Sequence, residues 1–153
     1  ASCLVGSEMC IRDSTIAMHP RCNYNNSPFT YLFPMLKDKT FELIKQANVV
    51  VSHNSTALLW AVILRKPIII VTTNEVIRNN LYRLQIEHFA FFLGKNTVNL
   101  DRIPNDFRWE SQLNIDETKY RNFVETYVKV SGSPEKPFWE IIIDRLEYDF
   151  QVL

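Results

Sequence analysis

The sequence predicts an α/β protein built on a parallel sheet with flanking helices, and three neighbouring segments carry this prediction. Residues 49–51 form a short β-branched run, as expected for a buried parallel strand. Residues 56–64 lack Gly and Pro and are rich in Ala and Leu, which favours a buried helix that Lys66-Pro67 ends. Residues 68–71 form a second buried strand. Together they predict a βαβ unit.

A polar turn, made of His53, Asn54, Ser55 and Thr56, joins the first strand of this unit to its helix. A helix start presents free backbone N–H groups and a partial positive charge, so hydroxyls and an amide beside it suit a phosphate. Ligands of open α/β sheets bind at this end of the strands. The same residue types are ordinary helix caps, and capping without a ligand stays an equal alternative.

A second polar strand end strengthens the ligand interpretation. Residues 15–18 predict a short strand, which ends at His19, Pro20 and Arg21. In one parallel sheet this end and the turn at 53–56 would face the same rim. The planar fork of Arg21 suits a phosphate, and His19 can donate to a phosphate oxygen or shield its charge when protonated. Each alone fits an ordinary loop residue, but the pair favours a ligand.

The remaining elements follow from helical spacing and turn residues. Apolar residues between 41 and 47 predict a helix with Thr40 as its cap, and residues 31–36 fit a strand or a loop. Glu75 belongs to a polar strand end at 72–75, and Asn79 or Asn80 would cap a helix that Gly94 ends. Further segments are a strand at 97–100, a loop at 103–116 with Trp109 as an anchor or exposed contact, and helices at 118–130 and 138–148.

The first residues of the chain have a separate origin in our interpretation. Residues 4–14 read LVGSEMCIRDS and resemble one translated frame of a transposase adapter used in sequencing libraries. They lack the basic start and apolar core of a signal peptide. We therefore expect residues 1–14 to be non-native and the natural chain to begin inside a gene near Thr15.

Composition excludes several classes of function. A content of 46% hydrophobic and 22% charged residues is typical of a globular domain, and no apolar run reaches membrane-spanning length. A net charge of zero argues against nucleic-acid binding. Beyond residue 14 only Cys22 remains, which leaves no disulfide framework or Cys-based metal site. Gly94 and Gly132 are the remaining glycines, so no Gly-rich phosphate loop is present.

The HPR triplet after a strand, followed later by ANVVVSHNSTALLWAVILRKPIII, resembles the C-terminal half of GT-B-type glycosyltransferases. The similarity is to bacterial surface-polysaccharide enzymes, including sialyltransferases and capsule transferases. In those families an HP pair and a Ser-Ser or Ser-Thr pair line the donor-nucleotide site, and the matching positions are His19-Pro20 and Ser55-Thr56. The resemblance implies that residues 15–153 form one Rossmann-like nucleotide-sugar-binding domain whose N-terminal partner domain is missing.

The resemblance also implies a mechanism. The phosphates of a CMP- or UDP-type sugar donor would be held by His19, Arg21 and the helix start at Ser55, with His19 stabilising the departing phosphate. No metal or cofactor is expected. The glutamate pair of many retaining GT-B enzymes is absent, and Glu75 is the only acidic residue near that rim. The general base would lie in the missing half, so this piece alone would bind nucleotide without turnover.

The implied setting is the cytoplasm, at or near the inner membrane face, with a glycan or lipid-linked acceptor and no nucleic acid. Peripheral association of the full-length protein with a membrane is left open. Two alternatives remain. The first is another enzyme on the same half-fold, either a sugar-nucleotide epimerase, for which Glu75 would be the acidic residue, or a polyol-phosphate transferase. The second is a noncatalytic α/β domain whose polar turns only cap helices.

Overall fold

The computed structural model describes residues 14–21 and 33–151, and the side chains within these ranges up to Tyr148. The adapter-like segment, apart from Ser14, lies outside the described residues, as do Cys22 and the first part of the apolar segment at 31–36.

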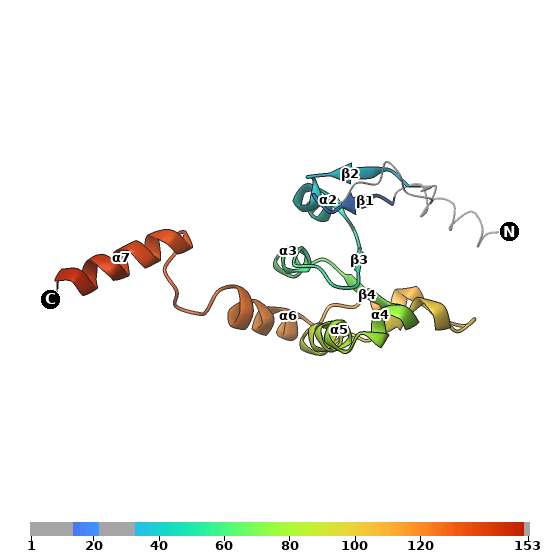
Figure 1. Ribbon diagram of the computed structural model, residues 1–153. Coiled ribbons are helices and arrows are strands. Elements are labelled where there is room, and N and C mark those ends of the chain that lie inside the picture. The colour runs from blue at the N-terminus through green and yellow to red at the C-terminus, as the bar shows by residue number, and fades with distance from the viewer. Residues whose placement is uncertain (1–13, 22–32, 152–153) are drawn as a thin grey trace.

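The described strands pair in parallel, which confirms the predicted α/β class, but they form two sheets (Figure 1). The larger sheet has the order β3 (Val50–Ser52), β4 (Ile68–Thr72) and β5 (Thr97–Asn99). The smaller sheet pairs β1 (Ile16–Met18) with β2 (Met35–Lys37). Helices flank these sheets, an arrangement consistent with a Rossmann-like fold.

The prediction that the strand at 15–18 lies in one sheet with the strand at 49–51 is wrong. β1 takes β2 as its neighbour, and the Ile16 N–H also donates to the Pro34 carbonyl at 2.9 Å. The chain after Phe33 therefore supplies the partner strand, and within the ambiguous segment at 31–36 the residues Met35 and Leu36 are strand. Val51 in β3 is 59% exposed, so β1 does not cover that side chain.

The helices follow the strands in the order that the sequence predicts, with one addition. α4 is a short helix that the sequence does not predict as a separate element. The α-helices within residues 14–21 and 33–151 are α2 (Thr40–Gln46), α3 (Leu58–Ile63), α4 (Asn74–Arg78), α5 (Asn80–Leu93), α6 (Glu117–Phe123) and α7 (Phe138–Gln151). A π-helical turn, Val124–Val128, continues α6, and two 3₁₀ turns occupy Leu100–Arg102 and Trp109–Gln112.

The predicted βαβ unit is present as β3, α3 and β4. β3 and β4 pair in register from Val50 opposite Ile68 to Ser52 opposite Ile70. α3 begins two residues later than the sequence suggests, because the N–H groups of Leu58 and Leu59 donate to the carbonyls of Ser55 and Thr56, at 3.1 Å each, in a tighter turn.

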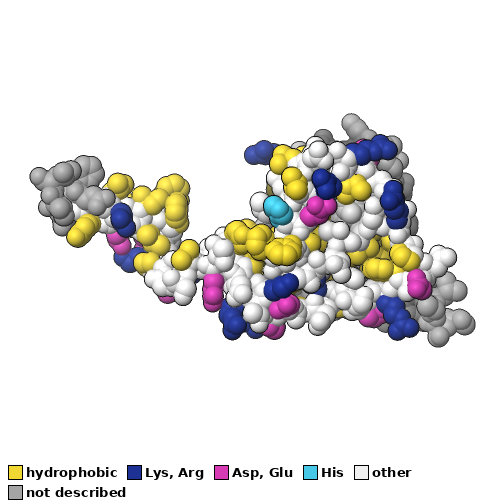
Figure 2. Space-filling view, turned by 90° about the horizontal axis from the view of Figure 1, so that it is seen from below, with side chains coloured by type: hydrophobic (Ala, Val, Ile, Leu, Met, Phe, Trp, Pro, Cys, Tyr) yellow, Lys and Arg dark blue, Asp and Glu magenta, His cyan; other side chains and the backbone are white. Residues whose placement is uncertain are grey.

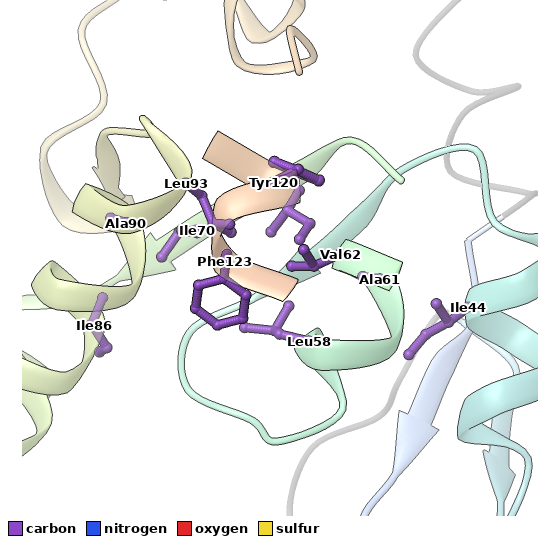
Figure 3. Close-up of a cluster of buried hydrophobic side chains, with 11 residues drawn as sticks. Ile44, Leu58, Ala61, Val62, Ile70, Ile86, Ala90, Leu93, Tyr120 and Phe123 are labelled. Carbon is purple, nitrogen blue, oxygen red and sulfur yellow. The ribbon is translucent and has the colours of Figure 1, made fainter. Parts of the chain in front are cut away.

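The core lies on one face of the larger sheet (Figure 3). Ile68 and Ile70 alternate along β4 and are almost fully buried, so they share that face. α3, α5 and α6 cover it, and Ile44 of α2 extends the cluster toward the smaller sheet. The buried side chains of these three helices are Leu58, Ala61, Val62, Ile86, Ala90, Leu93, Tyr120 and Phe123.

Of the helix ends assigned to Thr40, Asn79 or Asn80, and Gly94, the last two are confirmed. The Asn79 side chain caps α5 by accepting from the N–H groups of Leu81 and Tyr82 at 3.0 and 3.2 Å, and Gly94 ends this helix with φ of 66°. The cap assigned to Thr40 is wrong. Thr40 is the first helical residue of α2, and Lys39 takes the cap position without a side-chain cap bond.

The loop at 103–116 is tied to the body through Lys95. The Lys95 ammonium donates to the carbonyl of Gln112, at 2.7 Å, and to the carbonyl of Asn114. Partial burial of this ammonium lowers the pKa of Lys95. Trp109 is exposed and packs edge-to-face on Phe107, with ring centroids 4.9 Å apart, so it is an exposed contact within the loop. Within 14–21 and 33–151, no helix is long and apolar enough to cross a membrane.

Candidate phosphate-binding site

His19 and Arg21 form a small turn directly after β1. The backbone N–H of Arg21 donates to Nδ1 of His19 at 3.1 Å, and both residues are exposed. Because Nδ1 accepts this bond, the neutral imidazole carries its proton on Nε2. His19 therefore offers an N–H donor to a ligand, while its ring is oriented by its own backbone.

The turn after β3 is held together by its own residues. The Ser55 hydroxyl accepts from the Ala57 N–H at 3.2 Å, and the Trp60 N–H donates to the Ala57 carbonyl at 3.1 Å. With the Leu58 and Leu59 bonds described above, the N–H groups at the start of α3 are all used inside the turn. The helix has six residues. Anion binding here would therefore depend on side chains. The Ser55 hydroxyl is engaged within its own turn, whereas Ala57 takes the cap position of α3 without a side-chain cap bond.

The three other side chains of this turn differ in their hydrogen bonding. The Asn54 side-chain amide donates to Oε1 of Gln85 at 2.8 Å, which ties the turn to α5. His53 and Thr56 are exposed. Toward the other described residues, the side chains of His53, Thr56 and Arg21 make no hydrogen bond or ion pair, so they are available to a ligand.

The structure does not place the two polar ends along one continuous rim. His19 and Arg21 follow β1 of the smaller sheet, whereas the turn at 53–56 follows β3 of the larger sheet. α2 connects the two sheets (Figure 1). β2 and α2 therefore separate the two ends along the chain, and a ligand that touches both would bridge the sheets.

A polar cluster that the sequence did not reveal lies where β4 and β5 end. Thr72 and Asn99 are opposite each other in the ladder. The Asn74 N–H donates to Oδ2 of Asp101 at 2.7 Å, the Asn99 amide donates to Oδ1 of Asn74 at 3.1 Å, and the Asp101 N–H donates to Oδ1 of Asn99 at 3.0 Å. The one available signal is that polar residues follow each strand.

Glu75 stands beside this cluster, exposed in the first turn of α4. The Thr72 hydroxyl, at the end of β4, is buried and has no hydrogen-bond partner among the described residues. A carboxylate at this position can accept hydrogen bonds from hydroxyl groups of a ligand, whereas it would repel a phosphate. In the part of the chain that the structure describes, no three His, Cys, Asp or Glu side chains are grouped as metal ligands.

Comparison of the chain with protein-family models, with curated proteins and with solved structures gives no match. The function is therefore inferred from the chain's own residues.

Proposed function

We propose that the chain is the donor-nucleotide-binding part of a glycosyltransferase of surface-polysaccharide or lipopolysaccharide synthesis. The observation that carries the proposal is a set of exposed basic side chains at two strand ends: His19 and Arg21 follow β1 of the smaller sheet, and His53 follows β3 of the larger sheet. Ligands of α/β folds bind at these ends, and guanidinium and imidazole groups are donors that suit phosphate oxygens.

Each residue has a distinct role in this proposal. Arg21 engages two oxygens of the donor phosphate through its planar fork, and Nε2–H of His19 donates to the oxygen that links phosphate to sugar. That oxygen gains negative charge as the sugar leaves, so His19 stabilises the leaving group. His53 and Thr56 hold the phosphate from the side of β3. Glu75 accepts from ribose or sugar hydroxyls at the end of β4.

The other participants lie outside this chain. The acceptor is a glycan or a lipid-linked sugar, and its general base belongs to a further domain. The donor is a CMP or UDP sugar used in the cytoplasm, close to the inner membrane face, without a bound metal. On this proposal the chain alone binds nucleotide but does not transfer sugar.

One observation favours a second candidate function. The Ser55 hydroxyl and the first N–H groups of α3 are all used inside their own turn, as they would be in a noncatalytic α/β domain. Such a domain would have no affinity for nucleotides, and substituting His19 or Ser55 would change only its stability.

Calorimetric titration of the full chain with CMP, UDP, CDP and GDP separates these candidates. Arg21→Ala and His53→Ala should each weaken binding of one nucleotide about tenfold or more, consistent with one lost charge-assisted hydrogen bond. His88→Ala is the control, because His88 is an exposed histidine on α5. Thermal unfolding should be unchanged in all three variants. Absence of saturable nucleotide binding by the folded chain would refute the transferase proposal.

A further inference from the structure

α7 is an amphipathic helix with a free apolar face. Trp139, Ile142, Ile143 and Leu146 recur at helical spacing, so they lie on one side of the helix. Trp139 is 71% exposed, and Ile143 and Leu146 are half exposed. Figure 1 shows α7 extending away from the rest of the molecule. A contiguous exposed apolar face of this kind is typical of an interaction surface.

The segment between the π-helical turn and α7 holds this helix in its outward position. Lys129 forms an ion pair with Glu135, and Lys136 forms one with Asp144 of α7 at 2.6 Å. Pro134 lines a hollow together with the side of α7 that carries Tyr148, opposite the Trp139 side. The segment before α7 therefore contacts the polar side of this helix, and the apolar face of α7 points away from that segment.

A second free apolar surface lies on the outer face of α5. Its buried side carries Ile86, Ala90 and Leu93, while Leu81, Leu84, Phe91 and Phe92 lie on the opposite side and are exposed. Tyr127 extends this surface through a ring contact with Phe92 at 5.1 Å. Figure 2 views the molecule from the side of α5 and α6 and shows hydrophobic side chains gathered there and along α7.

We propose that two copies of this chain exchange α7, so that the apolar face of each α7 packs on the outer face of α5 in the other copy. The two helices match in length, because each has fourteen residues and spans about 21 Å. A cation of α6 beside the α5 surface is complementary to acidic residues of α7. Lys119 lies with its ammonium 5.9 Å from the centre of the Phe91 ring, and α7 carries Glu140 and Glu147 without partners among the described residues.

The buried area favours exchange in both directions. One helix-on-helix contact of this length buries roughly 800 Å², the size of a weak crystal contact. Two such contacts related by a twofold axis bury about 1,600 Å², the size of a standard stable interface. An isologous arrangement makes both contacts at once, since each copy supplies one α7 and one α5 surface.

Analytical ultracentrifugation of the full chain in reducing buffer tests the exchange. The wild type should sediment as a dimer of its 18.0 kDa chain. A double change in α7, Trp139→Ser with Leu146→Ser, should give a monomer, and so should Phe91→Ser with Leu84→Ser in α5. Ile103→Ser, an exposed apolar position elsewhere, should remain a dimer.

The circular dichroism spectrum of each variant shows that it is folded. A monomeric wild type would overturn the proposal. A dimer that the α7 variant dissociates but the folded α5 variant does not would also overturn it, because α7 would then pair with another surface, such as a second α7.

Discussion

The hydroxyl group of Tyr120 in α6 donates to the carbonyl of Lys66, 3.2 Å away and 54 positions earlier in the chain. The ring of Tyr120 is almost fully buried in the core. This bond satisfies a carbonyl in the short connection between α3 and β4. It joins the C-terminal helices to the βαβ unit at the point where the central strand begins.

Replacing Tyr120 by Phe should lower the free energy of unfolding by about 1–2 kcal/mol, because the Lys66 carbonyl would lose its partner in a partly buried setting. Tyr127→Phe is the matched control, since Tyr127 is exposed and its hydroxyl makes no hydrogen bond with the described residues. Urea unfolding measures the free energy of unfolding of both variants. Equal midpoints for the two variants would show that the Tyr120 bond contributes nothing to stability.

The same residue predicts a loss of stability in alkali. Burial raises the pKa of Tyr120 from 10.0 to about 12. The folded state therefore keeps this proton at a higher pH than the unfolded state does. The stability contributed by the neutral phenol is complete below pH 10 and is lost as the pH rises to about 12, on the order of 2–3 kcal/mol in total.

Urea unfolding at a series of pH values across that window checks this prediction. Other tyrosines and lysines titrate in the same range, so the difference between Tyr120→Phe and wild type is the relevant quantity. That difference should shrink as the pH rises. A difference that stays constant with pH would contradict a raised pKa of Tyr120.

Asn79→Ala should destabilise the protein by about 1 kcal/mol, because two N–H groups at the start of α5 would lose the side-chain oxygen that caps them. Asn80→Ala is the control, since Asn80 is the exposed first residue of the same helix. Thermal unfolding distinguishes them. If both substitutions shift the melting temperature equally, the cap assignment is incorrect.

Gly94 and Gly132 both have a positive φ, yet we expect different costs from alanine at the two positions. A Cβ at Gly94 would meet Cδ of Lys119 at 2.8 Å, whereas nothing lies within 4 Å of a Cβ at Gly132. Both variants should lose about 1 kcal/mol to backbone strain. Gly94→Ala should lose more, and removing the long side chain with Lys119→Ala should recover only that excess. Recovery of the full loss would mean that the positive φ at Gly94 carries no strain.

At the candidate site, Arg21→Lys should weaken nucleotide binding about tenfold, because an ammonium cannot bind two phosphate oxygens through a planar fork. Arg108→Lys, on an exposed loop, is the control. Calorimetric titration with the nucleotide identified for the wild type provides the measurement. Unchanged affinity would place Arg21 outside the phosphate site.

Local sequence was sufficient for much of the fold. Short-range signals specify β3, β4 and the helix between them, because β-branched residues favour the strands at the positions where they occur. Pro67, Asn79 and Gly94 likewise mark helix ends within a few residues of their own positions. α4 was missed because it has only five residues, between Thr73 and Asn79, two residues that both act as caps. A helix so short leaves no periodicity to detect.

Strand pairing and the geometry of the candidate site were less predictable from the sequence. Nothing local to residues 16–18 specifies β2 instead of β3 as the neighbouring strand, because pairing joins distant segments. The bonds among Asn74, Asn99 and Asp101 likewise depend on the register of β4 against β5. The residue types at His19, Arg21 and His53 could be named from the sequence, but the division of their strands between two sheets could not.

The division of the strands between two sheets has a consequence for local unfolding of the molecule. β4 is paired on both sides and almost fully buried, so its amides should be among the last to exchange with deuterium, while the three-residue ladder of β1 and β2 should exchange early. A ligand held by Arg21 on one sheet and His53 on the other would connect the smaller sheet, which unfolds locally at low cost, to the larger sheet, which unfolds locally at high cost. Binding would then slow exchange in β1 and β2 far more than in β4, and the substrate itself would act as a structural tie between the two sheets.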